Sequence, residues 1–432
     1  MQGVLVYRQA IGFWDTPKHR LLRIRYQLLG GLIFAAGVPL LVRMAYLPDV
    51  LSNSNHQVTV AAAIIAHLAG YTLYRRLGTF PGVAAASAIL PTFAMTYGIV
   101  FLVIFFFRFD YSRFQAGASF LLSISWYFGL SFFAKRLEPA RLALVPGGDV
   151  AQVTSIKGVT WRTLSSPIAS PGRIQGVVAD LRADLSDAWE RFIADCALSG
   201  TPVYHVKQIV ESLTGRIAID HLSENTLGSL NPNQAYLTLK YAVDFVVALG
   251  VLALAMPFLL LIAVLIRLDS PGPVLFCQQR VGYHGRVFTI FKFRTMRIAP
   301  ASGSDDRTHA ITADGDHRIT RLGRFLRRTR IDELPQLVNI LRGEMSWVGP
   351  RPEALPLSRW YEGQLPFYRY RHIVRPGITG WAQVNQGHVS DVEDVRTKLH
   401  YDFYYIKNFS PWIDVIIYIK TVGTILGGFG AK

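Results

Sequence analysis

Apolar residues are concentrated in long uninterrupted segments, and four of these segments lie in the first third of the chain. They cover residues 27–48, 57–74, 83–107 and 114–134. A helix of roughly 20 residues crosses the hydrocarbon core of a bilayer, so each segment is about long enough to span a membrane. The pattern therefore predicts four transmembrane helices within residues 26–135. The alternative is a set of buried helices in a large soluble protein.

Positive charges flank these segments unevenly, and their distribution predicts an orientation. Basic residues precede the first segment and follow the second and fourth, whereas the connection 49–56 carries almost none. By the positive-inside rule, residues 1–25 form a cytoplasmic segment and the chain returns to the cytoplasm near residue 135. Arg108 and Arg113 oppose this orientation but are outnumbered. The supporting residues are Arg20, Arg23, Arg25, Arg75, Arg76, Lys135, Arg136 and Arg141.

Residues 136–230 change character and alternate short strand-like runs with a helical one. Strands that alternate with helices predict a small, Rossmann-like parallel α/β domain. The Gly147-Gly148 turn is not a GxGxxG fingerprint, so a structural or regulatory role is favoured over a nucleotide site. The runs typical of strands are 141–145, 174–180 and 201–206, and the run with helical periodicity is 187–199.

A fifth apolar segment, residues 241–268, contains Pro257 near its middle. A proline inside a helix removes a hydrogen bond and kinks the helix. If this segment crossed the membrane, the strongly basic remainder of the chain would lie outside the cytoplasm. A kinked helix that enters and leaves on the same side avoids this conflict. We therefore predict a re-entrant helix, with a plain spanning helix as the alternative.

The overall composition agrees with a membrane protein that meets anionic partners. The chain has 432 residues, 51% of them hydrophobic, and a net charge of +16. Basic residues that flank apolar segments suit anionic lipid or phosphorylated substrates. These basic residues form no recognisable nucleic-acid-binding motif, which argues against nucleic acid as the partner. Cys196 and Cys277 are far apart and form no CxxC motif, so no disulfide framework and no thiolate metal site is expected.

Two adjacent carboxylates, Asp332 and Glu333, follow a cluster of arginines at the expected start of a short helix. Asp332 fits the N-cap, Pro335 is tolerated in the first turn, and Gly343 is a natural stop. The positive pole of the helix and the nearby guanidinium groups favour the ionised form of Asp332. Such a carboxylate suits nucleophilic attack, metal binding, or both. A capped, salt-bridged helix start is the alternative.

Further motifs surround this carboxylate pair. In chain order they are Asp269–Phe276, Gln279–Gly282, Phe291–Met296, Gly343–Pro352 and Arg375–Val384. Taken in this order after a kinked apolar helix, they resemble the bacterial sugar transferase family, the monotopic phosphoglycosyl transferases, over about residues 236–432. The membrane helices and the α/β domain before them resemble the large-subtype members, which prime exopolysaccharide, capsule or O-antigen synthesis.

The resemblance implies transfer of a sugar 1-phosphate from a UDP-sugar, with glucose or galactose expected, to undecaprenyl phosphate with release of UMP. It implies that Asp332 is the nucleophile of a covalent phosphosugar intermediate and that Glu333 is a Mg²⁺ ligand. Pro257 matches the helix-breaking proline of the family. Met256 precedes it where many members have serine, and Arg330 replaces the small polar residue common before the carboxylate pair.

The resemblance also implies a set of basic and amide side chains around the phosphates. Each arginine has a structural ion pair as its alternative role, and the amides could be ordinary helix surface. The expected substrate-binding residues are Lys292, Arg294, Arg327, Arg351 and Gln336, with Asn339 as a further residue that could orient the carboxylates.

The expected setting is the bacterial inner membrane, with a multi-pass chain whose catalytic domain faces the cytoplasm. The apolar end of the chain, residues 411–429, is expected to lie on the membrane face. The resemblance allows a homodimer, for which the sequence holds no motif. Two other function classes are considered: a non-catalytic membrane scaffold or nucleotide sensor of polysaccharide assembly, and a metal-dependent phosphatase of lipid diphosphates.

Overall fold

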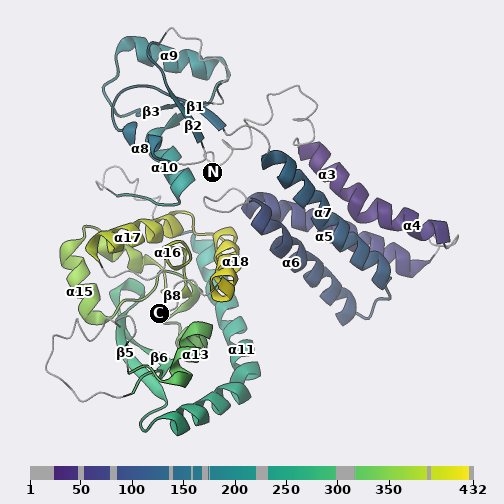
Figure 1. The fold of residues 1–432 in the computed structure, drawn as a ribbon, viewed down its shortest axis with the longest axis vertical. Coiled ribbons are helices and arrows are strands. Elements are labelled where there is room, and N and C mark those ends of the chain that lie inside the picture. The colour runs from purple at the N-terminus through teal and green to yellow at the C-terminus, as the bar shows by residue number, and fades with distance from the viewer. Residues whose placement is uncertain are drawn as a thin grey trace. The chain divides into compact units, whose positions relative to one another are not determined.

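The computed structural model describes most of the chain, which divides into two compact units, residues 1–215 and 216–432 (Figure 1). The predicted cytoplasmic segment 1–25 lies almost entirely outside the described residues, as does the predicted boundary near residue 230. The described residues are 24–46, 53–77, 85–135, 140–156, 159–167, 174, 176–219, 232–297, 316, 318–386 and 391–427.

The first unit begins with the four predicted helical segments, each at its expected place. They are a continuous stretch formed by α3 (Ile24–Leu32), the π-helix η2 (Ile33–Gly37) and α4 (Val38–Tyr46), then α5 (Ser54–Leu77), α6 (Ala85–Phe106) and α7 (Arg113–Lys135). Among the described helices, four have the length and apolar composition needed to cross a membrane. These are Ile24–Tyr46, Ser54–Arg76, Ala88–Phe106 and, in the second unit, α11 (Gln234–Asp269).

Helix α7 is not among these four, although it has 23 residues. It carries polar residues on the face that it buries against α5 and α6. Ser123 Oγ lies 2.9 Å from the Tyr97 hydroxyl and 3.1 Å from His67 Nδ1, and the Tyr127 hydroxyl lies 3.3 Å from His67 Nε2. Apolar side chains such as Leu121 of α7 and Phe105 of α6 are exposed. Buried polar groups and an apolar exterior are what a bilayer requires of a helical bundle.

The rest of the first unit is a small parallel α/β domain, as predicted. Its strands are β1 (Ala140–Leu144), β2 (Val159–Thr163), β3 (Gly176–Ala179) and β4 (Val203–His205), in the order β2-β1-β3-β4. All three pairings are parallel. Helices α8 (Ala151–Thr154) and α10 (Val206–Thr214) pack on one side of the sheet, and α9 (Asp187–Leu198) packs on the other. Strand β2 and helices α8 and α10 were not predicted.

The second unit is built on α11, which continues into a β-hairpin and a series of short elements. These are β5 (Leu275–Val281), η5 (Tyr283–Gly285), β6 (Val287–Phe293), α13 (Arg321–Thr329), η6 (Ile331–Gln336), α14 (Leu337–Leu341), β7 (Ser346–Val348), α15 (Leu355–Gln364), η7 (Tyr368–Ile373), β8 (Gly377–Thr379), α16 (Trp381–Asn385), α17 (Val392–Lys407) and α18 (Pro411–Gly427). Strands β5 and β6 are antiparallel, and β7 and β8 are parallel.

Helix α11 is longer than the predicted segment 241–268 and contains Pro257 within its 36 residues. Figure 1 draws this helix with a bend along its length, and a proline is the usual cause of a sharp helix bend. Many of its apolar side chains are exposed, including Leu254 at 86%. Entry and exit on the same side of a membrane stay a prediction.

Both halves of α11 support the elements that carry the carboxylate pair. Ala248, before the proline, packs in one cluster with residues of β6 and α14. Leu259 and Ile266, after the proline, pack in a second cluster with Phe293 of β6 and Leu326 of α13. The turn that holds Asp332 and Glu333 joins α13 to α14 and is therefore fixed between these two clusters.

Candidate active site

The carboxylate pair lies in a tight 3₁₀ turn, η6, instead of at the capped start of an α-helix. Arg330 adopts a left-handed conformation with φ of 58°, ends α13 and begins the turn. Glu333 N donates to Arg330 O over 3.2 Å. The prediction that Asp332 is the N-cap is therefore wrong. An arginine rarely adopts positive φ, so the sequence pattern did not reveal the break at Arg330.

Glu333 is buried and is surrounded by positive charge. Its Oε1 atom lies 2.8 Å from Lys292 Nζ, 3.3 Å from Arg351 Nη2 and 3.8 Å from Arg330 Nη1. Burial by itself would raise the pKa of this carboxyl, but the charges of Lys292, Arg351 and Arg330 outweigh that effect and lower its pKa well below the usual range. Glu333 is therefore ionised at any physiological pH.

Asp332 has the opposite environment, although it is the next residue in the chain. Its Oδ1 atom is buried and has no hydrogen-bond partner among the described residues. Burial, and then repulsion from Glu333, raise the pKa of Asp332 to about 6, against the opposing effect of Lys292. The arginines do lower this pKa, as expected, but burial and Glu333 outweigh them, so the expected net direction of the shift is wrong. The carboxylate is still mostly ionised at neutral pH, and a poorly solvated anionic oxygen suits nucleophilic attack.

Asn339, on helix α14 directly after the carboxylate pair, hydrogen-bonds to strand β6, which carries Lys292. Its Oδ1 accepts from Phe291 N over 3.2 Å, and its Nδ2 donates to Thr289 O over 2.7 Å. Both partners belong to β6, so α14 and Lys292 keep a fixed relative position. The side chain therefore orients the site by joining two elements.

The other predicted residues differ in how close they come to the carboxylates. Arg327 donates from Nε to Thr295 Oγ1 over 2.9 Å, and its charge lowers the pKa of Asp332. Gln336 is buried in the same turn. Arg294 donates to Ser270 O over 2.6 Å and so closes the end of α11, away from the contacts of the pair. Substrate roles for these three side chains stay predictions.

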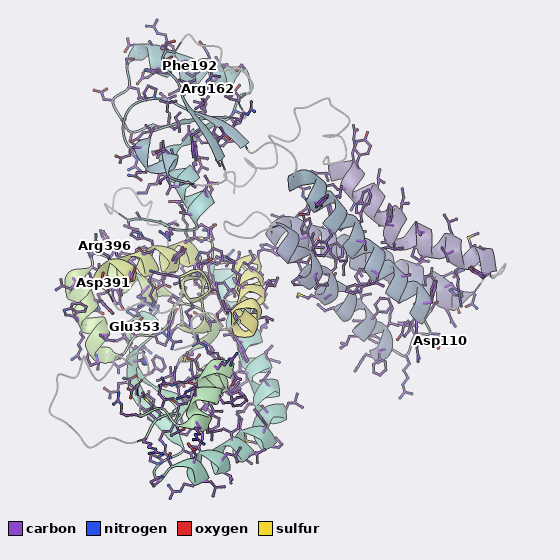
Figure 2. The ribbon with its side chains drawn as sticks, in the orientation of Figure 1. Asp110, Arg162, Phe192, Glu353, Asp391 and Arg396 are labelled. Atoms are coloured by element: carbon purple, nitrogen blue, oxygen red, sulfur yellow. The ribbon has the colours of Figure 1, made fainter. Side chains whose placement is uncertain are left out.

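The loop that carries Arg351 is held by residues to which the sequence assigned no individual role. Arg371 donates from Nη2 to Arg351 O over 2.9 Å and pairs with Asp402 over 2.8 Å. Arg280 donates from Nη1 to Pro352 O over 2.9 Å. Glu353, labelled in Figure 2, pairs with Lys398. Arg280 lies inside a motif noted above, whereas Arg371 follows no motif that could have revealed it.

The donor set fits a hard divalent cation that shares its ligands with a substrate. Among the described residues, no three histidine, cysteine or acidic side chains form a metal cluster. The buried Oδ1 of Asp332 nevertheless has no hydrogen-bond partner among the described residues. The ion pairs of Glu333 are made by its Oε1 atom, so its Oε2 atom could bind a cation. Mg²⁺ commonly binds one or two carboxylates together with substrate oxygens and water.

The charge balance around the pair suits an anionic substrate. Four cationic side chains act on the two carboxylates, namely Lys292, Arg327, Arg330 and Arg351. Lys292, Arg327 and Arg351 are at least half buried, so their charges are weakly screened by solvent. A ligand with several negative oxygens would be attracted to the excess positive charge, and guanidinium groups bind such oxygens in pairs.

Comparison with known proteins identifies relatives of the second unit and of nearly the whole chain. The family model described as bacterial sugar transferase matches residues 235–428. A UDP-N-acetylgalactosamine-undecaprenyl-phosphate N-acetylgalactosaminephosphotransferase of Aeromonas hydrophila is 46% identical over 376 residues, which are 87% of this chain and 88% of that protein.

Two further relatives each match less than half of this chain. Both are named UDP-glucose:undecaprenyl-phosphate glucose-1-phosphate transferase, and both are 42% identical to this chain. The protein of Xanthomonas campestris pv. campestris matches 46% of this chain and 41% of its own length. The protein of Escherichia coli K12 matches 43% of this chain and 39% of its own length.

Proposed function

The chain belongs to the bacterial sugar transferase family and is a phosphoglycosyl transferase, and from that premise we propose that Asp332 is its nucleophile in the transfer of a sugar 1-phosphate from a UDP-sugar to undecaprenyl phosphate. The observation that carries this assignment is the contrast within the pair. Glu333 is neutralised by three cations, whereas Asp332 keeps a buried oxygen without a hydrogen-bond partner among the described residues.

The reaction proceeds in two displacements on the same phosphorus atom. A carboxylate oxygen of Asp332 attacks the sugar-linked phosphorus of the UDP-sugar, and the bond from this phosphorus to the bridging oxygen breaks. UMP leaves with the electron pair, and a sugar phosphate remains on Asp332 as an acyl phosphate. A phosphate oxygen of undecaprenyl phosphate then attacks that phosphorus. The bond to Asp332 breaks, which frees the carboxylate and forms the lipid-linked diphosphate sugar.

Lys292 and Arg351 act on the charge that the substrate brings. Both contact Glu333 Oε1, at 2.8 and 3.3 Å. They lie at one carboxylate, so a diphosphate placed beside Asp332 meets positive charge that is already in position. Preorganised charge of this kind needs no reorganisation when negative charge develops on the leaving group.

Glu333, together with Asp332, is proposed to hold Mg²⁺. When bound, this ion supplies positive charge to the diphosphate oxygens. The low pKa of Glu333 keeps it available as an anionic ligand at all relevant pH values. Lys292 and Arg351 offset part of that negative charge, which leaves the binding of the ion dependent on substrate oxygens as further ligands.

The donor sugar is proposed to be a UDP-hexose or UDP-N-acetylhexosamine. The relative that matches 88% of its own length is named for N-acetylgalactosamine, which favours that sugar over the glucose or galactose expected from the motifs. The relatives named for glucose match between 42% and 52% of the chain. The membrane is proposed to be the bacterial inner membrane, with the active site on the cytoplasmic side, where UDP-sugars are made. A role in exopolysaccharide, capsule or O-antigen synthesis follows from the same premise.

The test is UMP release by the purified chain with Mg²⁺, undecaprenyl phosphate and a panel of UDP-N-acetylgalactosamine, UDP-glucose and UDP-galactose. We expect Asp332→Asn to abolish both turnover and the phosphosugar adduct that mass spectrometry detects on the wild-type protein. Asp391→Asn, an exposed change at the start of α17, is the control and should leave both intact. An adduct that persists in Asp332→Asn would overturn the assignment of the nucleophile.

The panel also separates the alternatives from the proposal. A metal-dependent phosphatase would release inorganic phosphate without needing a UDP-sugar, whereas the proposed reaction releases UMP and depends on one. A non-catalytic scaffold would release neither product, and it loses its support because the relatives are transferases.

A further inference from the structure

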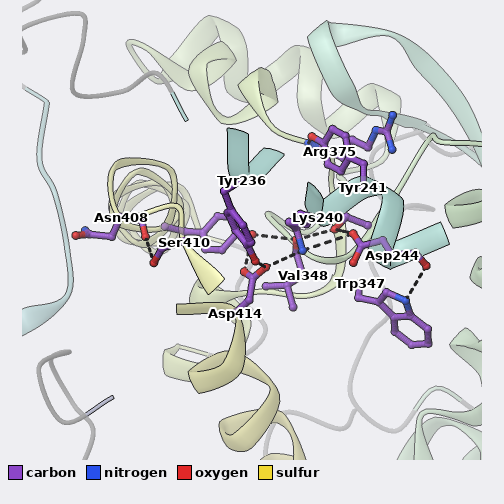
Figure 3. Close-up of polar contacts among 12 residues, drawn as sticks. Tyr236, Lys240, Tyr241, Asp244, Trp347, Val348, Arg375, Asn408, Ser410 and Asp414 are labelled. Atoms are coloured by element: carbon purple, nitrogen blue, oxygen red, sulfur yellow. Dashed lines mark hydrogen bonds and ion pairs between the residues drawn. The ribbon is translucent and has the colours of Figure 1, made fainter. Parts of the chain in front are cut away.

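Strand β7 is the short element that leads directly into Arg351, and each of its three residues is held from outside the strand (Figure 3). Ser346 Oγ donates to the carboxylate of Asp244 on α11. Trp347 donates from Nε1 to Asp244 O over 3.3 Å. Val348 O accepts from the Tyr405 hydroxyl of α17 over 3.1 Å. The position of β7 is therefore set by α11 and α17.

These contacts converge on a buried ionic centre, which we define as Lys240, Asp244 and Asp414. Lys240 Nζ lies 2.8 Å from Asp414 Oδ2 and 3.5 Å from Asp244 Oδ2 (Figure 3). The Tyr236 hydroxyl donates to Asp414 Oδ2 over 2.6 Å, and the Tyr405 hydroxyl lies 2.9 Å from Asp414 Oδ1. The three charged side chains are each at most 6% exposed. The centre thus joins α11 to α18, and Tyr405 connects it to α17.

A direct covalent and steric path connects β7 with the active site. Gly349 follows the strand and is pressed against the backbone of the Arg375–Gly377 segment, because a Cβ atom there would lie 2.3 Å from Arg375 O. Arg351 comes two residues later and donates from Nη1 and Nη2 to Glu333 Oε1, each over 3.3 Å. A shift of β7 therefore moves Arg351 relative to Glu333.

Stability alone is a poor explanation for burying three charges at this place. Replacing a buried ion pair by apolar side chains of similar volume is often neutral or stabilising, because desolvation of the charges opposes their attraction. Such a centre fixes the relative positions of the elements that it joins, because each hydrogen bond to a carboxylate requires a donor at a suitable distance and angle. Here the donors and acceptors come from α11, β7, α17 and α18, and one relative placement of these elements satisfies them.

We propose that Tyr405 and the buried ionic centre position Arg351. Through them, the position of α11 relative to β7 determines how Arg351 contacts Glu333. Tyr405 is the connection that a conservative change can remove, because its one hydroxyl hydrogen is shared between two acceptors, Val348 O at 3.1 Å and Asp414 Oδ1 at 2.9 Å. This inference rests on the proposed role of the Glu333 site in catalysis. It assigns to these side chains no contact with substrate.

The experiment compares Tyr405→Phe with Tyr361→Phe, a matched loss of one hydroxyl from a tyrosine buried on α15. UMP release is measured per folded protein, with size-exclusion chromatography as the measure of folding. We expect Tyr405→Phe to lower kcat by about tenfold, the rate equivalent of one well-placed hydrogen bond, and to leave the KM for the UDP-sugar within about twofold. Tyr361→Phe should keep wild-type kinetics. Ser346→Ala should act like Tyr405→Phe, because it releases β7 from Asp244.

A double-mutant cycle shows whether the effect passes through Arg351. In an Arg351→Ala background, Tyr405→Phe should lower kcat by less than about twofold. The side chain that Tyr405 positions is absent there, so the two effects are not additive. Equal losses in both backgrounds, or wild-type kcat in Tyr405→Phe, would overturn the inference. Those results leave the proposed function intact, whereas a wild-type protein that releases no UMP from any UDP-sugar would contradict the function itself.

Discussion

Arg330→Gln offers a quantitative test of the electrostatics around Asp332. The reactive form of Asp332 is the carboxylate, and the charge of Arg330 favours that form. Removing this charge raises the pKa of Asp332, so less carboxylate is present at a given acidic pH. The pH-dependent part of the loss should therefore appear on the acid side of the pH profile, and the ratio of the two activities should become constant above about pH 8, where the carboxylate is ionised in both proteins.

The size of the shift follows from position and exposure. Arg330 lies 3.8 Å from Glu333 Oε1, and its side chain is 37% exposed. A unit charge about 5 Å away contributes about 0.8 kcal/mol at a dielectric constant of 80 and about 3.3 kcal/mol at 20. Exposure favours the lower end, so we take about 1 kcal/mol, or about 0.7 pKa unit. The pKa of Asp332 would rise from about 6 by that amount, and the ionised fraction at pH 6 would fall about threefold.

The assay is kcat/KM for the UDP-sugar between pH 5.5 and 8.5. This constant reports the free enzyme and is independent of the titration of undecaprenyl phosphate, whose own phosphate has a pKa near 6. Arg330→Lys is the control: it keeps the charge and should keep the wild-type profile. A Gln variant whose acid limb overlies that of the wild type, or moves to lower pH, would refute the reasoning.

Two further predictions concern the metal and the packing beside Arg351. Removal of divalent cations with EDTA should stop UMP release, and added Mg²⁺ should restore it; turnover that persists in EDTA contradicts the proposed role of Glu333. Gly349→Ala should lower the free energy of unfolding by roughly 1–3 kcal/mol, because its Cβ would lie 2.3 Å from Arg375 O. Gly363→Ala, where a Cβ meets nothing within 4 Å, is the control in the same thermal-shift measurement, and equal melting temperatures for the two variants would argue against this account.

The elements that depend on a long apolar run could be predicted from the sequence. The four N-terminal helical segments and α11 were expected because a bilayer imposes a minimum length that few other structures share. The parallel sheet followed from strand-like runs that alternate with a helical one. Strand β2 was missed, since Val159–Thr163 mixes apolar and polar side chains at half-buried and exposed positions and carries no strong pattern.

The site itself was only partly readable. The carboxylate pair and its basic neighbours Lys292 and Arg351 stand out as residue types in motifs, and the structure brings them together. The pKa of Asp332 had the wrong sign because sequence shows neighbouring charges but not burial, and burial is the larger effect here. Arg294 closes a helix end, and nothing in its motif distinguishes that role from phosphate binding.

The contacts of Asp414 have a consequence for how the protein is made. Helix α11 ends at Asp269 and α18 begins at Pro411, so a ribosome that adds about 5–20 residues per second completes α11 about 7–28 seconds before it reaches α18. During that interval Lys240 and Asp244, one helical turn apart, have each other as their nearest opposite charges. Helix α11 is therefore made first, and its contacts with Asp414 form last. Helix α18 thus completes the ionic centre, and a chain truncated before α18 lacks Asp414, the residue that pairs with Lys240.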